Sequence, residues 1–142
     1  MNVSLSCPTR LRAPRAGPFA ALALVVLLVV ALQRGERVVA VACEEVRAPG
    51  RAVRVIAGCG SNDTKKSRLL AQACRRAGAD ALLVVTPYYN KPTAEGLYRH
   101  YMAIWEATRF PVVAYNVTGR TSVDMGPETA ARLAKAGAIA RI

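Results

Sequence analysis

The sequence predicts an α/β fold built on a parallel β-sheet that is buried on both faces. Three aliphatic stretches centred near Ile56, Leu83 and Val113 lie 27 and 30 residues apart, and a fourth begins near Ile139. A helical pattern follows each of the first three. Continuous apolar strands joined by helices are typical of parallel sheets with both faces covered. The repeat fits a doubly wound sheet or a (β/α)8 barrel; no GxGxxG or Walker loop follows a strand, which disfavours the nucleotide-binding version.

Capping residues, glycines and prolines set the expected limits of the elements. Asp63 or Thr64 can cap one helix, which Gly78 ends, and Thr93 can cap the next. The expected strands cover residues 53–58, 81–86 and 112–116, with a fourth starting near 139. The expected helices cover residues 37–46, 65–77, the stretch after Thr93 and 127–136, and a loop containing Gly119 follows the third strand.

An aromatic stripe marks the helix that follows Thr93. Its members stand at positions i, i+3, i+4 and i+7: Tyr98, Tyr101, Met102 and Trp105. Residues with this spacing lie on one face of a helix. We interpret the stripe as core packing.

Charge and cysteine content exclude several functional classes. The 142 residues carry a net charge of +11, but the basic residues are scattered, and no stacking-aromatic pattern accompanies them. We therefore expect a solvated basic surface and no nucleic-acid partner. Cysteines at positions 7, 43, 59 and 74 form no CxxC pair, and the single His100 cannot complete a zinc set. We expect reduced thiols, no metal and no cofactor.

An apolar run of 15 residues, 18–32, follows arginines at positions 10, 12 and 15. A membrane-spanning helix needs about 20 apolar residues, and no small-residue cleavage site follows the run. An export signal, a membrane anchor and a misassigned N-terminus stay open as interpretations. We treat residues 1–35 as an atypical N-terminal segment, and we expect a cytoplasmic protein without membrane contact through this segment.

Polar residues stand directly after two of the predicted strands. Tyr88, Tyr89 and Asn90 follow one strand, and Tyr115 closes the next, with Arg120 just beyond it. In a barrel, these positions lie at the C-terminal mouth, where catalytic groups collect. Two phenols and a guanidinium there would provide a proton relay and a carboxylate clamp. In the alternative interpretation, the tyrosines only cap the core.

Three segments carry a resemblance to a known family. They are VIAGCGSNDT, ADALLVVTPYYNKPTAEGLYRHY and PVVAYNVTGRTSVDMGPETAARLA, and together they closely resemble the dihydrodipicolinate synthase family over residues 36–142. The resemblance implies a (β/α)8 barrel of pyruvate-dependent class I lyases. In this family, pyruvate forms a Schiff base with a lysine, and the resulting enamine attacks L-aspartate 4-semialdehyde. Residues 36–142 would form a partial barrel, with about strands 3–5 and the start of strand 6.

The resemblance also implies roles for individual residues. Tyr115 matches the tyrosine that shuttles protons beside the Schiff base, and Tyr89 matches the one that reaches into a neighbouring subunit's relay. Arg120 matches the arginine that holds the semialdehyde carboxylate. Asn62 and Tyr88 match positions that line a lysine feedback site in some members. Lys66 stands where a Glu often completes that site, which argues against feedback inhibition.

The departures from the family decide the expected activity. No GTTGE motif precedes the first resembling segment, Thr118 replaces a usual proline, and no lysine matches the Schiff-base position. We therefore expect a truncated synthase that is inactive as it stands, because a class I lyase needs that amine. Its expected partners are pyruvate, aspartate semialdehyde and further copies in a dimer or tetramer. The alternatives are a related aldolase such as N-acetylneuraminate lyase and a non-catalytic, membrane-associated half-barrel.

Overall fold

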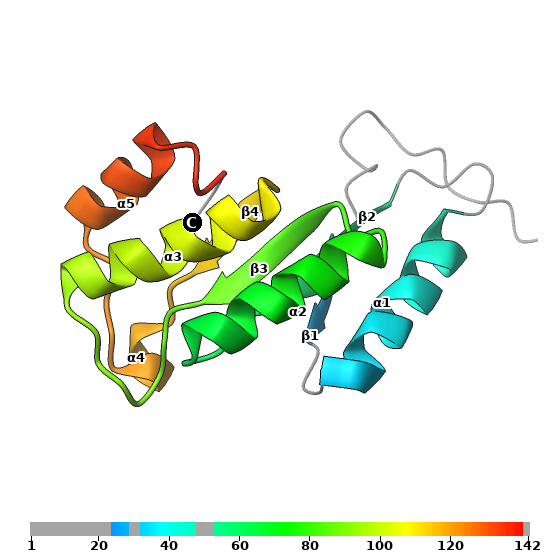
Figure 1. Cartoon of the computed structure of the whole chain (residues 1–142), viewed down its shortest axis with the longest axis horizontal. Helices are drawn as coiled ribbons and strands as arrows, with labels where there is room; N and C mark the ends of the chain where they lie inside the picture. The colour runs from blue at the N-terminus through cyan, green and yellow to red at the C-terminus, as the bar shows by residue number, and fades with distance from the viewer. Residues whose placement is uncertain (1–23, 29–31, 48–52, 141–142) are drawn as a thin grey trace, which may run out of the picture.

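The computed structural model describes residues 24–28, 32–47 and 53–140 (Figure 1). Within these residues, four parallel strands form one sheet. The strands are β1 (Leu24–Leu28), β2 (Arg54–Gly58), β3 (Ala81–Val85) and β4 (Val112–Tyr115). The helices are α1 (Leu32–Val46), α2 (Thr64–Arg76), α3 (Ala94–Thr108), α4 (Thr118–Thr121) and α5 (Pro127–Lys135).

The strands lie in the sheet in the order in which they occur in the chain, β1-β2-β3-β4. Helices α1, α2 and α3 lie side by side over one face of the sheet (Figure 1), and α3 also contacts α5. A doubly wound sheet reverses its strand order and carries helices on both faces. The described part of the chain does neither, which disfavours the doubly wound alternative.

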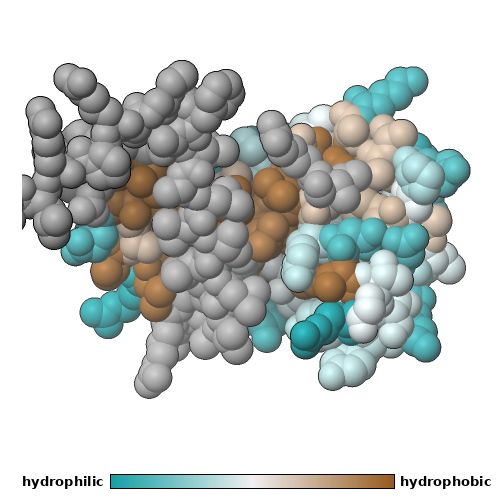
Figure 2. All heavy atoms as spheres, turned by 180° about the vertical axis from the view of Figure 1, so that it is seen from behind, coloured by the Kyte–Doolittle hydropathy of each residue, from teal (hydrophilic) through white to brown (hydrophobic). Residues whose placement is uncertain are grey.

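Both faces of the sheet are apolar, as the continuous aliphatic strands predict. The alternating residues of β2, β3 and β4 on the helix side are fully buried: Val55, Ala57, Leu82, Val84, Val112 and Ala114. The positions between them, Ile56, Leu83 and Val113, point to the other face and are half-buried. Figure 2, which shows the molecule from behind, has hydrophobic residues near the middle of that face. Such a sheet requires an apolar cover on its second face as well.

The predicted strands and helices between residues 53 and 136 are confirmed to within one residue at each end. The helix caps are confirmed too. Asp63 is the N-cap of α2, since its Oδ1 accepts hydrogen bonds from the backbone N–H groups of Lys65 at 2.8 Å and Lys66 at 3.2 Å. Thr93 caps α3 and accepts a hydrogen bond from Gly96 at 3.2 Å.

The predicted limits were wrong at three places. Helix α1 begins at Leu32 instead of residue 37, because the glycine at position 35 costs a helix only about 1 kcal/mol. The Gly119 segment contains the short helix α4 instead of a plain loop. No strand covers residues 138–140, where a single backbone bond, from Ala140 to Val112 at 2.7 Å, joins the chain to β4. One bond does not make a ladder.

Part of the apolar run at residues 18–32 lies in the sheet. Residues Leu24–Leu28 form β1, which pairs with β2 in register from Leu24 opposite Arg54 to Leu28 opposite Gly58. These five residues therefore form a strand and not a membrane helix, and among the described helices none is long and apolar enough to cross a membrane. Residues 1–23, which hold the rest of the predicted signal-like region up to β1, lie outside the described residues.

The aromatic stripe of α3 packs against the core, as predicted. Tyr101 is fully buried, and its hydroxyl donates a hydrogen bond to the carbonyl of Val84 at 2.9 Å. The other three members are half-buried. Two of them meet a guanidinium, because Arg132 lies 4.1 Å from the ring centroid of Tyr98 and another arginine covers Trp105.

Three of the four cysteines lie in the described residues. Cys43, Cys59 and Cys74 are buried and free, as expected for small core thiols. Burial raises the pKa of Cys74 to about 11 and that of Cys59 further, so both remain protonated at neutral pH. The described residues contain no group of three or more His, Cys, Asp or Glu that could hold a metal ion.

Candidate active site

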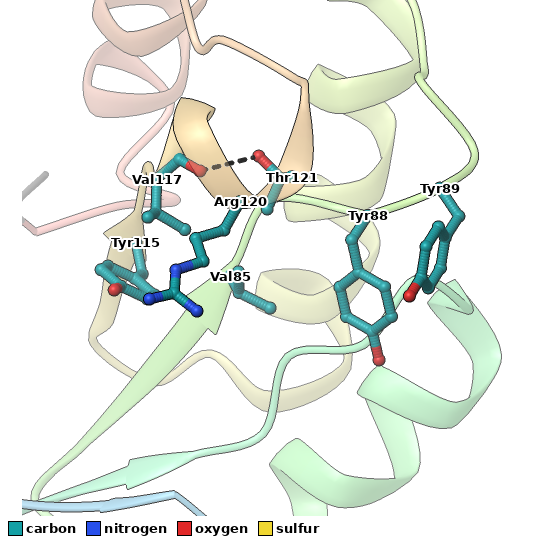
Figure 3. Close-up of a pocket in the computed structure, with 7 residues that line it drawn as sticks. All are labelled: Val85, Tyr88, Tyr89, Tyr115, Val117, Arg120 and Thr121. Atoms are coloured by element: carbon teal, nitrogen blue, oxygen red, sulfur yellow. Dashed lines mark hydrogen bonds between the residues drawn. The ribbon is translucent and has the colours of Figure 1, made fainter.

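The ends of β3 and β4 enclose a hollow of about 450 Å³ (Figure 3). Because the two strands are parallel neighbours, the segments that follow them emerge at the same edge of the sheet. The hollow is lined by Val85, Tyr88, Tyr89, Tyr115, Val117, Arg120 and Thr121. The structure thus brings together four of the five predicted site residues.

The β3 side of the hollow is a turn that carries two adjacent tyrosines. The rings of Tyr88 and Tyr89 meet edge to face, with their centroids 5.5 Å apart. Tyr89 has a φ of 68° and is 86% exposed, so its backbone turns sharply and its ring projects into solvent. Asn90 then donates a hydrogen bond to the carbonyl of Asn62 at 2.8 Å. Asn62 lies outside the hollow and contacts its rim through this bond.

The β4 side is a loop closed by side-chain hydrogen bonds. Asn116 donates from Nδ2 to Asp124 at 2.8 Å and accepts at Oδ1 from the N–H of Met125 at 3.2 Å. Thr118, which replaces the family's usual proline, donates to the same Asp124 oxygen at 3.2 Å. A hydroxyl therefore ties down the turn in which a proline would restrict the backbone.

Within this loop, Tyr115 and Arg120 carry the polar groups of the hollow. Tyr115 is 46% exposed at the end of β4, and Arg120 extends from α4 toward it (Figure 3). Within the described part of the chain, no carboxylate forms a salt bridge with Arg120. An exposed guanidinium beside a phenol can bind an anionic group and present a proton donor to it.

Two buried threonines join the two sides of the hollow. The hydroxyl of Thr86, directly after β3, donates to the hydroxyl of Thr121 in α4 at 3.1 Å. The N–H of Thr86 donates to the carbonyl of Tyr115 at 3.1 Å. Neither threonine had a role predicted from the sequence, although a threonine at the end of an otherwise aliphatic strand is a signal, because a buried hydroxyl there needs a partner.

Gly60 is a third residue whose role the sequence did not reveal. A Cβ on this residue would lie 2.4 Å from the backbone nitrogen of Val85, so only glycine allows this close approach of the segment after β2 to the end of β3. Gly60 therefore supports the wall of the hollow at Val85.

None of the lysines in the described residues lines the hollow. Lys65 and Lys66 lie exposed in the first turn of α2, Lys91 lies exposed in the turn after β3, and Lys135 ends α5. The hollow thus holds phenols and a guanidinium but no amine nucleophile from these residues.

Parallel βα units with polar side chains at the C-terminal ends of their strands are typical of α/β enzymes. The family described as the dihydrodipicolinate synthetase family matches residues 30–142, and the chain belongs to this family. The resemblance predicted from the three motifs is therefore confirmed.

Individual relatives agree with this assignment. The chain is 72% identical over 95 residues to the 4-hydroxy-tetrahydrodipicolinate synthase of Anaeromyxobacter sp. (strain Fw109-5). These 95 residues are 67% of this chain and 32% of the relative. The chain is 58% identical over 91 residues to the synthase of Rhizobium meliloti (strain 1021), covering 64% and 31%. The chain spans about a third of the length of the curated relatives that it matches.

Solved structures of this family have the same fold over the matched region. The dihydrodipicolinate synthase of Acinetobacter baumannii, solved in complex with pyruvate, is 46% identical with a TM-score of 0.67, covering 75% of this chain and 35% of that one. The enzyme of Thermotoga maritima is 49% identical with a TM-score of 0.65, covering 70% and 32%.

Proposed function

We propose that this chain carries the proton-relay and carboxylate-binding part of a 4-hydroxy-tetrahydrodipicolinate synthase site, which condenses pyruvate with L-aspartate 4-semialdehyde. The observation that carries the proposal is the hollow in which Tyr115, Arg120 and Tyr88 converge from two neighbouring strands. It occurs in a chain that is 72% identical to such a synthase over the matched region.

We propose that β2, β3 and β4 are the third, fourth and fifth strands of a (β/α)8 barrel domain, which includes all of α1 and so begins before the predicted boundary at residue 36. The sheet supports this because its second face is apolar, as a barrel interior must be. Residues 138–140 are in no strand, but the bond from Ala140 to Val112 brings this segment beside β4, where a sixth strand would begin. Strand β1 lies where the second strand of the barrel would pair.

In the proposed reaction, pyruvate is held as an enamine on a lysine amine, and its methyl carbon attacks the aldehyde carbon of the second substrate. Tyr115 moves protons to and from the reacting atoms through its hydroxyl. Arg120 binds the semialdehyde carboxylate, since its guanidinium is exposed and forms no salt bridge within the described residues.

Tyr89 is proposed to complete the relay of a second copy in a dimer or tetramer. Its 86% exposure leaves the ring free to enter another subunit. Asn62 and Tyr88 are proposed to border a regulatory pocket, in which the exposed Lys66 repels the ammonium groups of lysine and so weakens feedback inhibition. The three free, buried thiols support a reducing, cytoplasmic location.

The 142-residue chain by itself is proposed to be inactive, because a Schiff base requires an amine in the hollow. After incubation with pyruvate and borohydride, mass spectrometry should find no added mass on the chain. A mass increase that corresponds to reduced pyruvate on Lys65, Lys66, Lys91 or Lys135 would contradict this.

The synthase assignment is tested in a chimera. In it, residues 53–140 replace the matching stretch of the Anaeromyxobacter sp. (strain Fw109-5) synthase, which contributes the rest of the barrel. This chimera should condense pyruvate with aspartate semialdehyde. Tyr115→Phe should lower its kcat by about 100- to 1,000-fold, because a preorganised proton donor is lost. A folded but inactive chimera, or a Tyr115→Phe variant at the full rate, would refute the assignment.

A further inference from the structure

Thr86 and Thr121 form a buried polar contact beside the proposed site, and no step of the proposed reaction uses them. Both side chains are almost fully buried, and the residues stand 35 positions apart in the chain. A buried hydroxyl costs free energy unless it is hydrogen-bonded. The two threonines satisfy each other, which makes their contact a specific link between the segments that follow β3 and β4.

The hydrogen bonds run in one direction, because a hydroxyl has a single proton to donate. Thr86 gives its proton to Thr121 at 3.1 Å. Thr121 can then donate to the carbonyl of Val117 at 3.2 Å or of Val123 at 3.1 Å, and it also accepts from the N–H of Val123 at 3.3 Å. The link therefore passes from the end of β3 into the backbone on both sides of α4.

Helix α4 has little stability of its own. It is a single turn of four residues, its N-cap Val117 provides no side-chain bond, and Ser122 ends it with a φ of 55°. An isolated turn of this length does not persist without tertiary contacts. Its orientation is therefore fixed by two anchors: the Thr118–Asp124 bond on the solvent side and the Thr86–Thr121 bond on the sheet side.

We propose that Thr86 and Thr121 are a positioning pair that aims the guanidinium of Arg120 at the carboxylate of the second substrate. Arg120 directly precedes Thr121, so any rotation of α4 moves the arginine relative to Tyr115. The inference rests on the proposed function. It adds that the affinity for the semialdehyde depends on the Thr86–Thr121 hydrogen bond, although neither threonine touches that substrate.

The two substrates should respond differently to loss of the pair. Pyruvate is held covalently on the lysine that the relative contributes, so its trapping does not depend on α4. The semialdehyde is held through its carboxylate, and a small misplacement of a guanidinium weakens that contact. In the chimera, Thr86→Val should raise the KM for aspartate semialdehyde about ten-fold and leave borohydride trapping of pyruvate unchanged.

Two matched variants separate the hydroxyl from simple packing. Thr86→Ser keeps the hydroxyl and should keep the KM of the parent chimera. Thr86→Ala removes the hydroxyl and puts no methyl group in its place. If the valine variant does not fold, the KM of the alanine variant is compared with that of the serine variant instead. Equal KM values for the serine and the alanine or valine variants would overturn the proposal.

A double-mutant cycle identifies the residue through which the pair acts. In an Arg120→Ala chimera, Thr86→Val should cause no further rise in the KM for the semialdehyde, because the arginine to be positioned is gone. A further ten-fold rise in that background would refute the inference and leave the synthase assignment intact. A folded parent chimera without condensation activity would instead remove the proposed function, and this inference with it.

Discussion

His100 should make the stability of this protein fall as the pH falls from 6.5 to 4. Its ring is buried in α3, Nδ1 lies 2.8 Å from the hydroxyl of Thr64, and Nε2 has no hydrogen-bond partner in the described residues. Burial lowers the pKa of His100 to about 4, against a smaller opposing effect of the Asp63 carboxylate.

The sign follows from comparing the folded and unfolded chains. In the unfolded chain, the imidazole takes up a proton near its ordinary pKa of 6.5, but the folded protein resists that proton down to about pH 4. The stabilising effect of the neutral ring is therefore complete above pH 6.5, and it is lost progressively between pH 6.5 and 4. With about 1.4 kcal/mol per pH unit, the loss is roughly 3 kcal/mol, a large share of a typical domain's stability.

The assay is urea unfolding followed by circular dichroism between pH 7.5 and 4.5, on the wild type and His100→Leu. The variant loses the bond to Thr64 at every pH, but its free energy of unfolding should vary by about 2 kcal/mol less over this range. Glu95→Gln is the matched control: hydrogen bonds from Arg132 and Arg99 lower the pKa of that carboxyl, so its effect is lost only below its ordinary value of 4.5. Parallel pH curves for the wild type and His100→Leu would refute the reasoning.

Three further predictions test the packing around the site by the same unfolding assay. Tyr101→Phe should destabilise the chain by about 1 kcal/mol, because it removes the buried hydrogen bond from the hydroxyl to the Val84 carbonyl of β3; an unchanged free energy of unfolding would contradict this. Asp63→Ala should cost about 1 kcal/mol by removing the N-cap of α2, and Asp63→Asn should restore most of it. Gly60→Ala should cost about 2 kcal/mol or more, since its Cβ would collide with the backbone of Val85, whereas Gly119→Ala, with nothing within 4 Å, should be harmless; equal effects of the two alanines would contradict this.

Local sequence determined the elements of this fold. The strand at residues 81–85 is a continuous aliphatic segment closed by Pro87, and α2 is capped by Asp63 and ends before Gly78. The aliphatic run, the proline, the N-cap and the glycine each act on a few neighbouring residues, through backbone conformation and capping. They can therefore be recognised without the tertiary structure. The sequence also indicated Tyr115 and Arg120, because parallel strands bring their C-terminal ends to one edge.

Local sequence failed where the partner of a segment lies far along the chain. Nothing in residues 18–32 distinguishes a signal-like run from an edge strand, because an aliphatic segment suits both environments. Pairing with β2 decided that residues 24–28 form a strand. The limit of α1 was missed for a similar reason, since its contacts with α2 and β2 outweigh the local cost of a glycine.

Only the tertiary structure decided how the site is held together. The hydroxyl pair of Thr86 and Thr121 spans 35 residues, and the close approach of Gly60 to Val85 spans two strands. Such contacts depend on the twist and register of the sheet, which the order of residues does not express locally. The sequence alone determined which side chains carry the proposed chemistry. The pairing of β3 with β4 determined where each of these side chains points.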